Sequence, residues 1–133
     1  MLRDFLEKLC DELAIQPAPK LNQDKFYPFA LNADVQMQIR DLEPGLGMQA
    51  KICPCPNGKR EDLFIHLMRA NLLGQGTGGS RIGLDADEKF LTLSLGLPYE
   101  MNYKTFKESI EDFVNYLLYW REEVAKFENE TLL

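Results

Sequence analysis

The sequence predicts a single α+β domain, in which three helices accompany a twisted antiparallel sheet in the order α-β-β-β-α-β-β-α. Three observations support this fold class. Apolar residues recur at helical spacing near both ends and in the middle of the chain, period-two alternation marks the segments between them, and short turn sequences separate those segments. A length of 133 residues suits one compact domain, which we expect to span residues 1–133.

The chain opens with an amphipathic pattern that predicts a helix over about residues 2–14. Apolar residues from Leu2 to Leu13 repeat every three or four positions. The pattern stops at Pro17 and Pro19, because proline cannot continue a helix.

Three strands are expected next, within residues 25–32, 34–42 and 46–53. Alternation is clearest in the second of them, where Val35, Met37 and Ile39 alternate with polar residues. The breaks are short and contain the Asn, Asp, Pro and Gly residues that tight turns require, so we expect an antiparallel meander. Pro28 lacks a backbone donor, which predicts an edge position for the first strand.

The middle helix is predicted over about residues 60–73, and its apolar residues cover more than one face. One face can pack on the sheet and the other requires a partner. Two further strands follow, within residues 80–87 and 88–97, joined by a turn at "DADE". The inward face of the second is expected to carry four leucines, namely Leu91, Leu93, Leu95 and Leu97.

The last helix begins near Tyr103, with either Asn102 or the capping-box pair Thr105 and Glu108 at its start. A long apolar seam follows at alternating steps of four and three, formed by Phe106, Ile110, Phe113, Leu117, Trp120, Val124 and Phe127. From about residue 129 the chain is expected to form either a disordered tail or a partner contact.

The glycine-rich run "GQGTGGS" invites comparison with phosphate-binding loops, which follow a strand and open a helix. Here the order is reversed, since a helix precedes the run and a strand follows it. We therefore predict a helix C-cap at Gly74 or Gly76 and a reversal into the strand. Because positive φ is expected at Gly78, replacing it with the β-branched valine should damage folding.

Composition and charge restrict the class of protein. Fifteen basic residues against 21 acidic ones give a net charge of −6, which disfavours direct nucleic-acid binding. No apolar run is long enough to cross a bilayer, and the acidic start is unlike a signal peptide, so we expect a cytoplasmic protein. Three cysteines, an odd number, indicate free thiols in a reducing compartment.

Chemistry-bearing residues are few. Cys53 and Cys55 stand too close for a typical zinc pair, and the alternative is two thiols in a proline turn. His66 lies in an apolar helix, where a packed or rim histidine is expected rather than a catalytic base. Arg81 either guides an acidic partner or is an exposed strand-end residue. We therefore expect no catalytic residues, metal or cofactor, and the surplus of apolar surface predicts a protein-interaction module.

The run from Ala70 to Trp120 resembles the signature region of class I type III secretion chaperones, the CesT or Tir-chaperone family. The resemblance lies in "ANLL" at the end of the helix, "TGG" before a strand, "GLD", and the leucine-rich strand that follows. The resemblance implies a small acidic α/β protein that binds without catalysis, in the bacterial cytoplasm.

The resemblance also implies partners and site residues. Such chaperones dimerise through the second helix and the strand after the glycines, here Leu67, Met68, Leu72, Ile82 and Leu84. The partner copy is either identical or a paralogous chaperone. The family binds an extended N-terminal segment of a secreted effector in apolar grooves, here Leu6, Leu9, Phe26, Phe29, Met37, Ile39 and Met48, and that segment can add strands to sheet edges.

The resemblance leaves a second role open. Some relatives are regulatory adaptors that contact RNA polymerase, a sigma factor or another transcription regulator. The "CPCP" sequence at residues 53–56 is foreign to the family pattern and either alters the turn into the middle helix or creates a redox-sensitive edge.

Overall fold

A computed structural model describes residues 1–57, 60–72 and 79–132, with side chains up to residue 129. Its elements follow the predicted order. They are α1 (Leu2–Leu13), β1 (Tyr27–Ala30), β2 (Gln36–Asp41), β3 (Leu46–Pro54), α2 (Arg60–Asn71), β4 (Arg81–Leu84), β5 (Phe90–Leu97) and α3 (Tyr103–Leu132). The predicted fold class is confirmed.

The five strands form one antiparallel sheet in the order β1-β2-β3-β5-β4. β1 is an edge strand, as Pro28 predicted, and β4 is the other edge. The Leu31 amide donates a hydrogen bond to the Val35 carbonyl at 3.0 Å. Every second residue of an antiparallel strand directs its backbone N–H and C=O groups to the same neighbour, so Phe29 and Tyr27 also direct theirs toward β2. Pro28, which has no N–H, therefore points its backbone nitrogen toward the free edge, where no ladder bond is lost.

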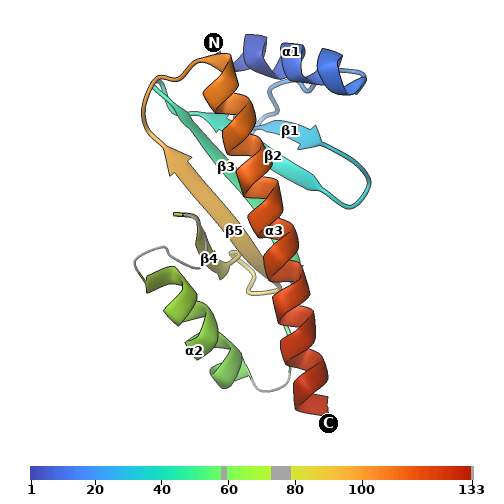
Figure 1. The fold of residues 1–133 in the computed structure, drawn as a ribbon, viewed down its shortest axis with the longest axis vertical. Coiled ribbons are helices and arrows are strands. Elements are labelled where there is room, and N and C mark those ends of the chain that lie inside the picture. Colours follow the sequence, from blue (N-terminus) through green and yellow to red (C-terminus); the bar gives the residue numbers. More distant parts are fainter. Residues whose placement is uncertain (58–59, 73–78, 133) are drawn as a thin grey trace.

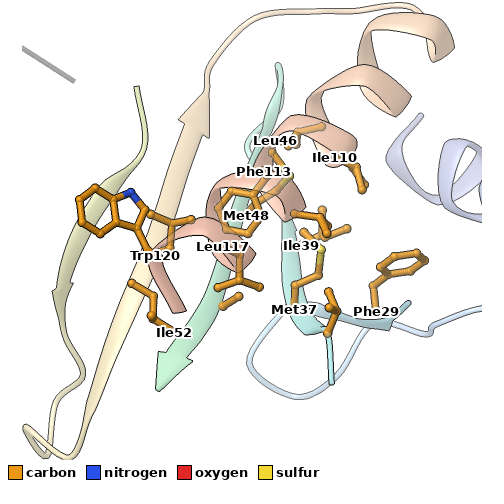
Figure 2. Packing of buried hydrophobic residues seen from close by; sticks show 14 of the residues in the cluster. Phe29, Met37, Ile39, Leu46, Met48, Ile52, Ile110, Phe113, Leu117 and Trp120 are labelled. Carbon is orange, nitrogen blue, oxygen red and sulfur yellow. The ribbon is translucent and has the colours of Figure 1, made fainter. Parts of the chain in front are cut away.

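The helices gather on one face of this sheet. α3 runs diagonally across that face, α1 lies near the N-terminal end of α3, and α2 lies beside β4 (Figure 1). The position of α2 on this face is shown by its contact with α3, since the centroid of the His66 ring lies 5.9 Å from that of the Trp120 ring. The α3 seam meets the alternating strand residues, as Phe113, Leu117 and Trp120 face the strand side chains (Figure 2). The seven predicted seam residues are buried or packed against the core.

α3 starts at an asparagine cap. The Asn102 Oδ1 atom accepts a hydrogen bond from the Thr105 amide at 2.9 Å, which selects Asn102 over the capping-box alternative. The helix continues to Leu132, and the expectation of a tail from about residue 129 stays a prediction, because side chains from residue 130 lie outside the described part.

One arginine fastens α3 to the end of the sheet. The Arg121 guanidinium donates to the carbonyl oxygens of Ile52 at 2.8 Å, Lys51 at 2.9 Å and Asp34 at 2.6 Å. The Lys51 and Ile52 carbonyls lie where β3 has a register shift, between Lys51 and Cys53, and Asp34 lies in the connection between β1 and β2. Arg121 therefore replaces missing sheet bonds with charge-assisted ones.

Candidate functional site

The outer face of α2 carries an exposed apolar stripe. Leu63 and Leu67 point into the core and are 1% and 4% exposed. On the other side of the helix, Ile65, Met68 and Leu72 are 50%, 70% and 68% exposed. Their spacing of three and four places them on one line, which we call the α2 stripe. The two-faced pattern predicted for this helix is confirmed, and its second face is uncovered in this chain.

A side-chain amide joins the end of α2 to β4. Asn71 Nδ2 donates to the Ile82 carbonyl and Asn71 Oδ1 accepts from the Ile82 amide, both at 2.8 Å. The backbone N–H and C=O groups of Ile82 point away from β5, so the Asn71 side chain lies at the free edge of the sheet beside Ile82. Sequence reasoning missed Asn71, because an asparagine at a helix end before glycines is typical of a cap rather than a contact with a later strand.

The five predicted dimer residues lie around this junction but differ in exposure. Met68, Leu72 and Leu84 present surface to solvent, with Leu84 38% exposed. Leu67 and Ile82 are buried beneath them, at 4% and 8%. As an interface, the set stays a prediction in which the exposed three make contact and the buried two support them.

Six of the seven predicted groove residues lie in the protein's own core. Their exposed fractions run from 0% to 3%, and they are Leu6, Leu9, Phe29, Met37, Ile39 and Met48. Figure 2 shows Phe29, Met37, Ile39 and Met48 with the α3 side chains on the same side of the sheet. Phe26 is half-buried, with the Arg40 guanidinium 5.7 Å from its ring centroid. These six side chains therefore present almost no surface to an effector.

An open apolar groove does exist between α1, β1 and α3. It has a volume of about 280 Å³ and includes Leu9 and Phe29 at its base. Its other apolar walls are residues that the sequence analysis did not assign to a groove, namely Leu13, Leu31, Ile110 and Val114. Leu13 is 42% exposed. We call this the α1–α3 groove, and only knowledge of the helix crossing could have revealed it.

An ion pair links α1 to α3. Lys107 Nζ lies 2.8 Å from Glu12 Oε2 and joins α3 to α1. The hydrogen bond from Lys107 lowers the pKa of Glu12, and the same bond raises the pKa of Lys107. Both side chains are exposed, so the ion pair fixes the orientation of α1 relative to α3 more than it adds to the free energy of unfolding.

A second hollow of about 420 Å³ lies at the N-terminal end of α1, where Leu2 and Phe5 line it. Apolar side chains of Phe5, Tyr99 and Met101 contribute to its lining, and its acidic residues are Asp41, Glu43 and Glu100. The Gly45 turn forms its floor, with φ of +93°. This acidic hollow suits an apolar side chain flanked by basic residues.

The cysteine pair and the histidine do not come together. Burial raises the pKa of Cys53 to about 11, and Cys55 Sγ lies 3.5 Å from an Arg60 guanidinium nitrogen. His66 packs instead between Trp120 and Phe127. In the part of the chain that the structure describes, no group of three or more histidine, cysteine or carboxylate side chains is placed to hold a metal ion.

The glycine run lies mostly beyond the described part. Residues 73–78, and with them the predicted caps at Gly74 and Gly76 and the expected behaviour of Gly78, fall outside the described residues. Gly79, just after them, has a φ of +88°. None of the helices in the described ranges is both long and apolar enough to cross a membrane.

Comparisons with known proteins agree with this fold. The Chlamydia pneumoniae protein CPj0713/CpB0740 is 24% identical over 123 residues, covering 90% of this chain and 93% of that protein. A chain of the ExsC–ExsE complex superposes with a TM-score of 0.73 at 12% identity, covering 91% of both chains. A chain of the HopA1–SchA chaperone–effector complex gives 0.66 at 15% identity, covering 91% of this chain and 93% of that one.

The family comparison is the decisive one. The model of the Tir chaperone protein (CesT) family matches residues 5–121, nearly the whole chain. The match includes the run from Ala70 to Trp120 that carried the resemblance. The chain therefore belongs to the Tir chaperone protein (CesT) family.

Proposed function

We propose that this protein is a type III secretion chaperone, which holds an extended segment of a secreted effector in the bacterial cytoplasm and keeps it competent for export. The observation that carries the proposal is an open apolar groove in a chain of the Tir chaperone family. A chaperone of this kind works by binding alone. Family membership bears out the expectation that the chain is not an enzyme.

The α1–α3 groove supplies the apolar contact. Its walls are aliphatic apart from the Phe29 ring, and Lys107, Glu111 and Asn115 form a polar rim. An anchoring leucine, isoleucine or phenylalanine of the effector segment would exchange water for this apolar surface. The polar side chains of the rim would form hydrogen bonds with the backbone of the same segment. An extended segment needs these bonds because it has no secondary structure that would pair its backbone N–H and C=O groups.

The acidic hollow extends the path along α1. A segment leaving the groove can continue to the hollow beside Phe5, where Asp41, Glu43 and Glu100 favour basic residues. The support for this path is that α1 lines both concave surfaces, one near its start and the other near its end. The predicted ligand is therefore an extended segment with apolar anchors and basic residues between them.

We also propose a dimer through the α2 stripe. Met68 and Leu72, each about two-thirds exposed, stand on one line with Ile65, and a partner helix would remove them from water. Each fully buried side chain of this size contributes about 1.5–3 kcal/mol. A second identical copy and a paralogous chaperone both fit this chemistry.

The test is co-expression with N-terminal fragments of secreted effectors from the same organism, followed by light scattering of the purified complex. Leu13→Glu should weaken effector binding about tenfold, since a carboxylate cannot be buried in the groove. Leu21→Glu is the matched control, because Leu21 is 55% exposed and lies outside the groove. Equal loss in both variants, or no bound fragment for the wild type, would contradict effector binding.

The dimer is tested separately. Met68→Glu should yield a monomer, whereas Leu118→Glu, at an exposed leucine of α3, should leave the mass unchanged. A wild type that stays monomeric alone and pairs with a co-expressed paralogue would identify the heterodimer. Recovery of RNA polymerase or a transcription regulator in place of an effector would favour the adaptor role predicted from the sequence.

A further inference from the structure

The face of the sheet turned away from the helices carries basic, neutral polar and glycine residues. Because successive strand residues point to opposite sides, the neighbours of the buried Met37, Ile39 and Leu93 all point away from the core. Register pairs Gln38 with Gln49, Gln49 with Ser94, and Ser94 with Arg81, in one row across four strands. We call this surface the open face, and it comprises Gln36, Gln38, Arg40, Gly47, Gln49, Lys51, Arg81, Gly83, Thr92, Ser94 and Gly96.

The charges of the open face are basic, on a chain whose net charge is −6. Arg40, Lys51 and Arg81 are exposed, and among the described residues none of them forms an ion pair within 4.0 Å. Lys51 Nζ sits 4.1 Å from the centre of the Phe90 ring. The Phe26 ring holds the Arg40 guanidinium in the same way, at 5.7 Å. Cation–π contacts therefore hold two of the three cations in place and leave their charge unneutralised.

Acidic groups lie at one end of the open face. Asp34 and Asp85 line the hollow next to Lys51. Asp85 is already engaged, because its Oδ1 atom accepts hydrogen bonds from the Lys89 amide at 2.8 Å and the Phe90 amide at 3.2 Å. The central and far parts of the face, around Arg40 and Arg81, line a hollow with no acidic residue.

Three strand glycines keep the open face shallow. A Cβ at Gly96 would meet no atom within 4 Å, one at Gly83 would meet only the Thr92 hydroxyl at 3.9 Å, and one at Gly47 would meet nothing closer than 3.8 Å. Among the described residues, only Gly45 and Gly79 are glycines with positive φ, so backbone conformation does not require these three. A glycine weakens a strand. Where neither its φ angle nor a close neighbour requires it, a strand glycine is typical of a site where another backbone approaches closely.

The glycines and short polar side chains leave two adjoining hollows on this face. Each has a volume of about 480 Å³, and Gln49 lines both. One contains Arg40, Arg81, Ser94, Gly47 and Gly96. Arg40 and Arg81 stand on strands β2 and β4, three strand spacings apart across the sheet and two residues apart along it, or about 16 Å between their backbones. That distance is about five residues of an extended chain.

We propose that the open face binds an extended acidic segment of a partner protein. Carboxylates about five residues apart would pair with Arg40 and Arg81. The glutamine amides and Ser94 would hydrogen-bond the backbone of the segment, and the glycines would admit that backbone close to the sheet. The surface lies on the opposite side of the sheet from the α1–α3 groove and the α2 stripe. The proposal goes beyond the effector contact and holds whether or not that contact exists.

The probe is a fluorescein-labelled 12-residue peptide of alternating glutamate and serine, titrated into the full chain by fluorescence anisotropy at low salt. A lysine–serine peptide and a 12-nucleotide oligothymidylate serve as comparison ligands. The acidic peptide should bind at least tenfold more tightly than either, and more weakly as salt rises. Equal binding of the lysine–serine peptide, or preference for the oligonucleotide, would overturn the proposal.

Variants locate the site. The double variant Arg40→Gln/Arg81→Gln should weaken acidic-peptide binding about tenfold. Its charge-matched control, Arg3→Gln/Lys126→Gln, removes two exposed cations of α1 and α3 and should change binding less than twofold. Gly96→Val should weaken binding about fivefold without lowering the melting temperature, since valine favours strands and has room here. An unchanged affinity in both open-face variants would show that the peptide binds elsewhere.

Discussion

Asn71 and Ile82 are joined by two hydrogen bonds of 2.8 Å, one in each direction, between a side-chain amide and a backbone amide eleven residues later. The side chain imitates the hydrogen bonding of one residue of a neighbouring strand. As a result α2 and the edge strand β4 are held as one unit, and the exposed side chains of both are presented in a fixed arrangement. A partner that docks on the α2 stripe therefore meets a preorganised surface.

Asn71→Leu should destabilise the fold by about 1–3 kcal/mol, because the Ile82 N–H and C=O lose their partners. Urea unfolding followed by circular dichroism measures the change. Asn129→Leu, at an exposed asparagine of α3, is the control and should change stability by less than about 0.5 kcal/mol. An Asn71 variant as stable as the control would mean that water satisfies the Ile82 backbone equally well.

Gly45→Ala should prevent stable folding or cost more than about 3 kcal/mol. Gly45 has a φ of +93°, and a Cβ there would overlap the carbonyl oxygen of Leu97, a backbone atom that cannot move aside. Gly96→Ala is the matched control, since φ is ordinary and the space is empty. Thermal unfolding of the two variants should separate them widely, and a Gly45 variant that melts with the wild type would contradict the described turn.

Arg121→Met should lower the free energy of unfolding by about 2–3 kcal/mol, because three carbonyls lose a charged donor while the apolar stem is roughly conserved. Arg121→Lys should recover only part of that loss, since an ammonium group cannot reproduce the planar fork of donors. Arg3→Met provides the comparison at an exposed arginine, with an expected change near zero. Full rescue by lysine would show that charge alone matters at this position.

Cys53 should react slowly with iodoacetamide at pH 8, because burial raises the pKa of its thiol to about 11 and the thiolate is the nucleophile. In a Cys10→Ala/Cys55→Ala background, mass spectrometry should show the rate rising with pH up to about 11. The unfolded thiol ionises at a lower pH than the folded one, so this group makes the fold less stable as pH rises from about 9 to about 11. Rapid alkylation at pH 8 would contradict the burial.

The fold was predictable because its signals are local. Alternation of Met37 and Ile39 with polar residues, the steps of the Phe106–Phe127 seam and the proline at position 28 each depend on a few neighbouring residues. These patterns report which face of an element is apolar. They do not report what covers it, and for Met37, Ile39 and Met48 the cover is α3 of the same chain rather than an effector.

The candidate surfaces were less predictable because they depend on how elements meet. Leu13 and Leu31 become groove walls only through the crossing of α1 and α3 over β1. Asn71 becomes a strand partner only because β4, which comes later in the chain, lies beside the end of α2. The exposed stripe of α2 was foreseen, since a helix that is apolar on two sides cannot bury both on one sheet.

Pro28 at one edge of the sheet and Asn71 at the other have a joint consequence for colloidal behaviour. An unprotected edge strand is a template for the ordered addition of further chains, as in amyloid growth. Here one edge lacks a donor at Pro28, and the other has its outward groups at Ile82 already occupied. With both edges interrupted at these positions, the sheet is a poor template for the ordered addition of further chains.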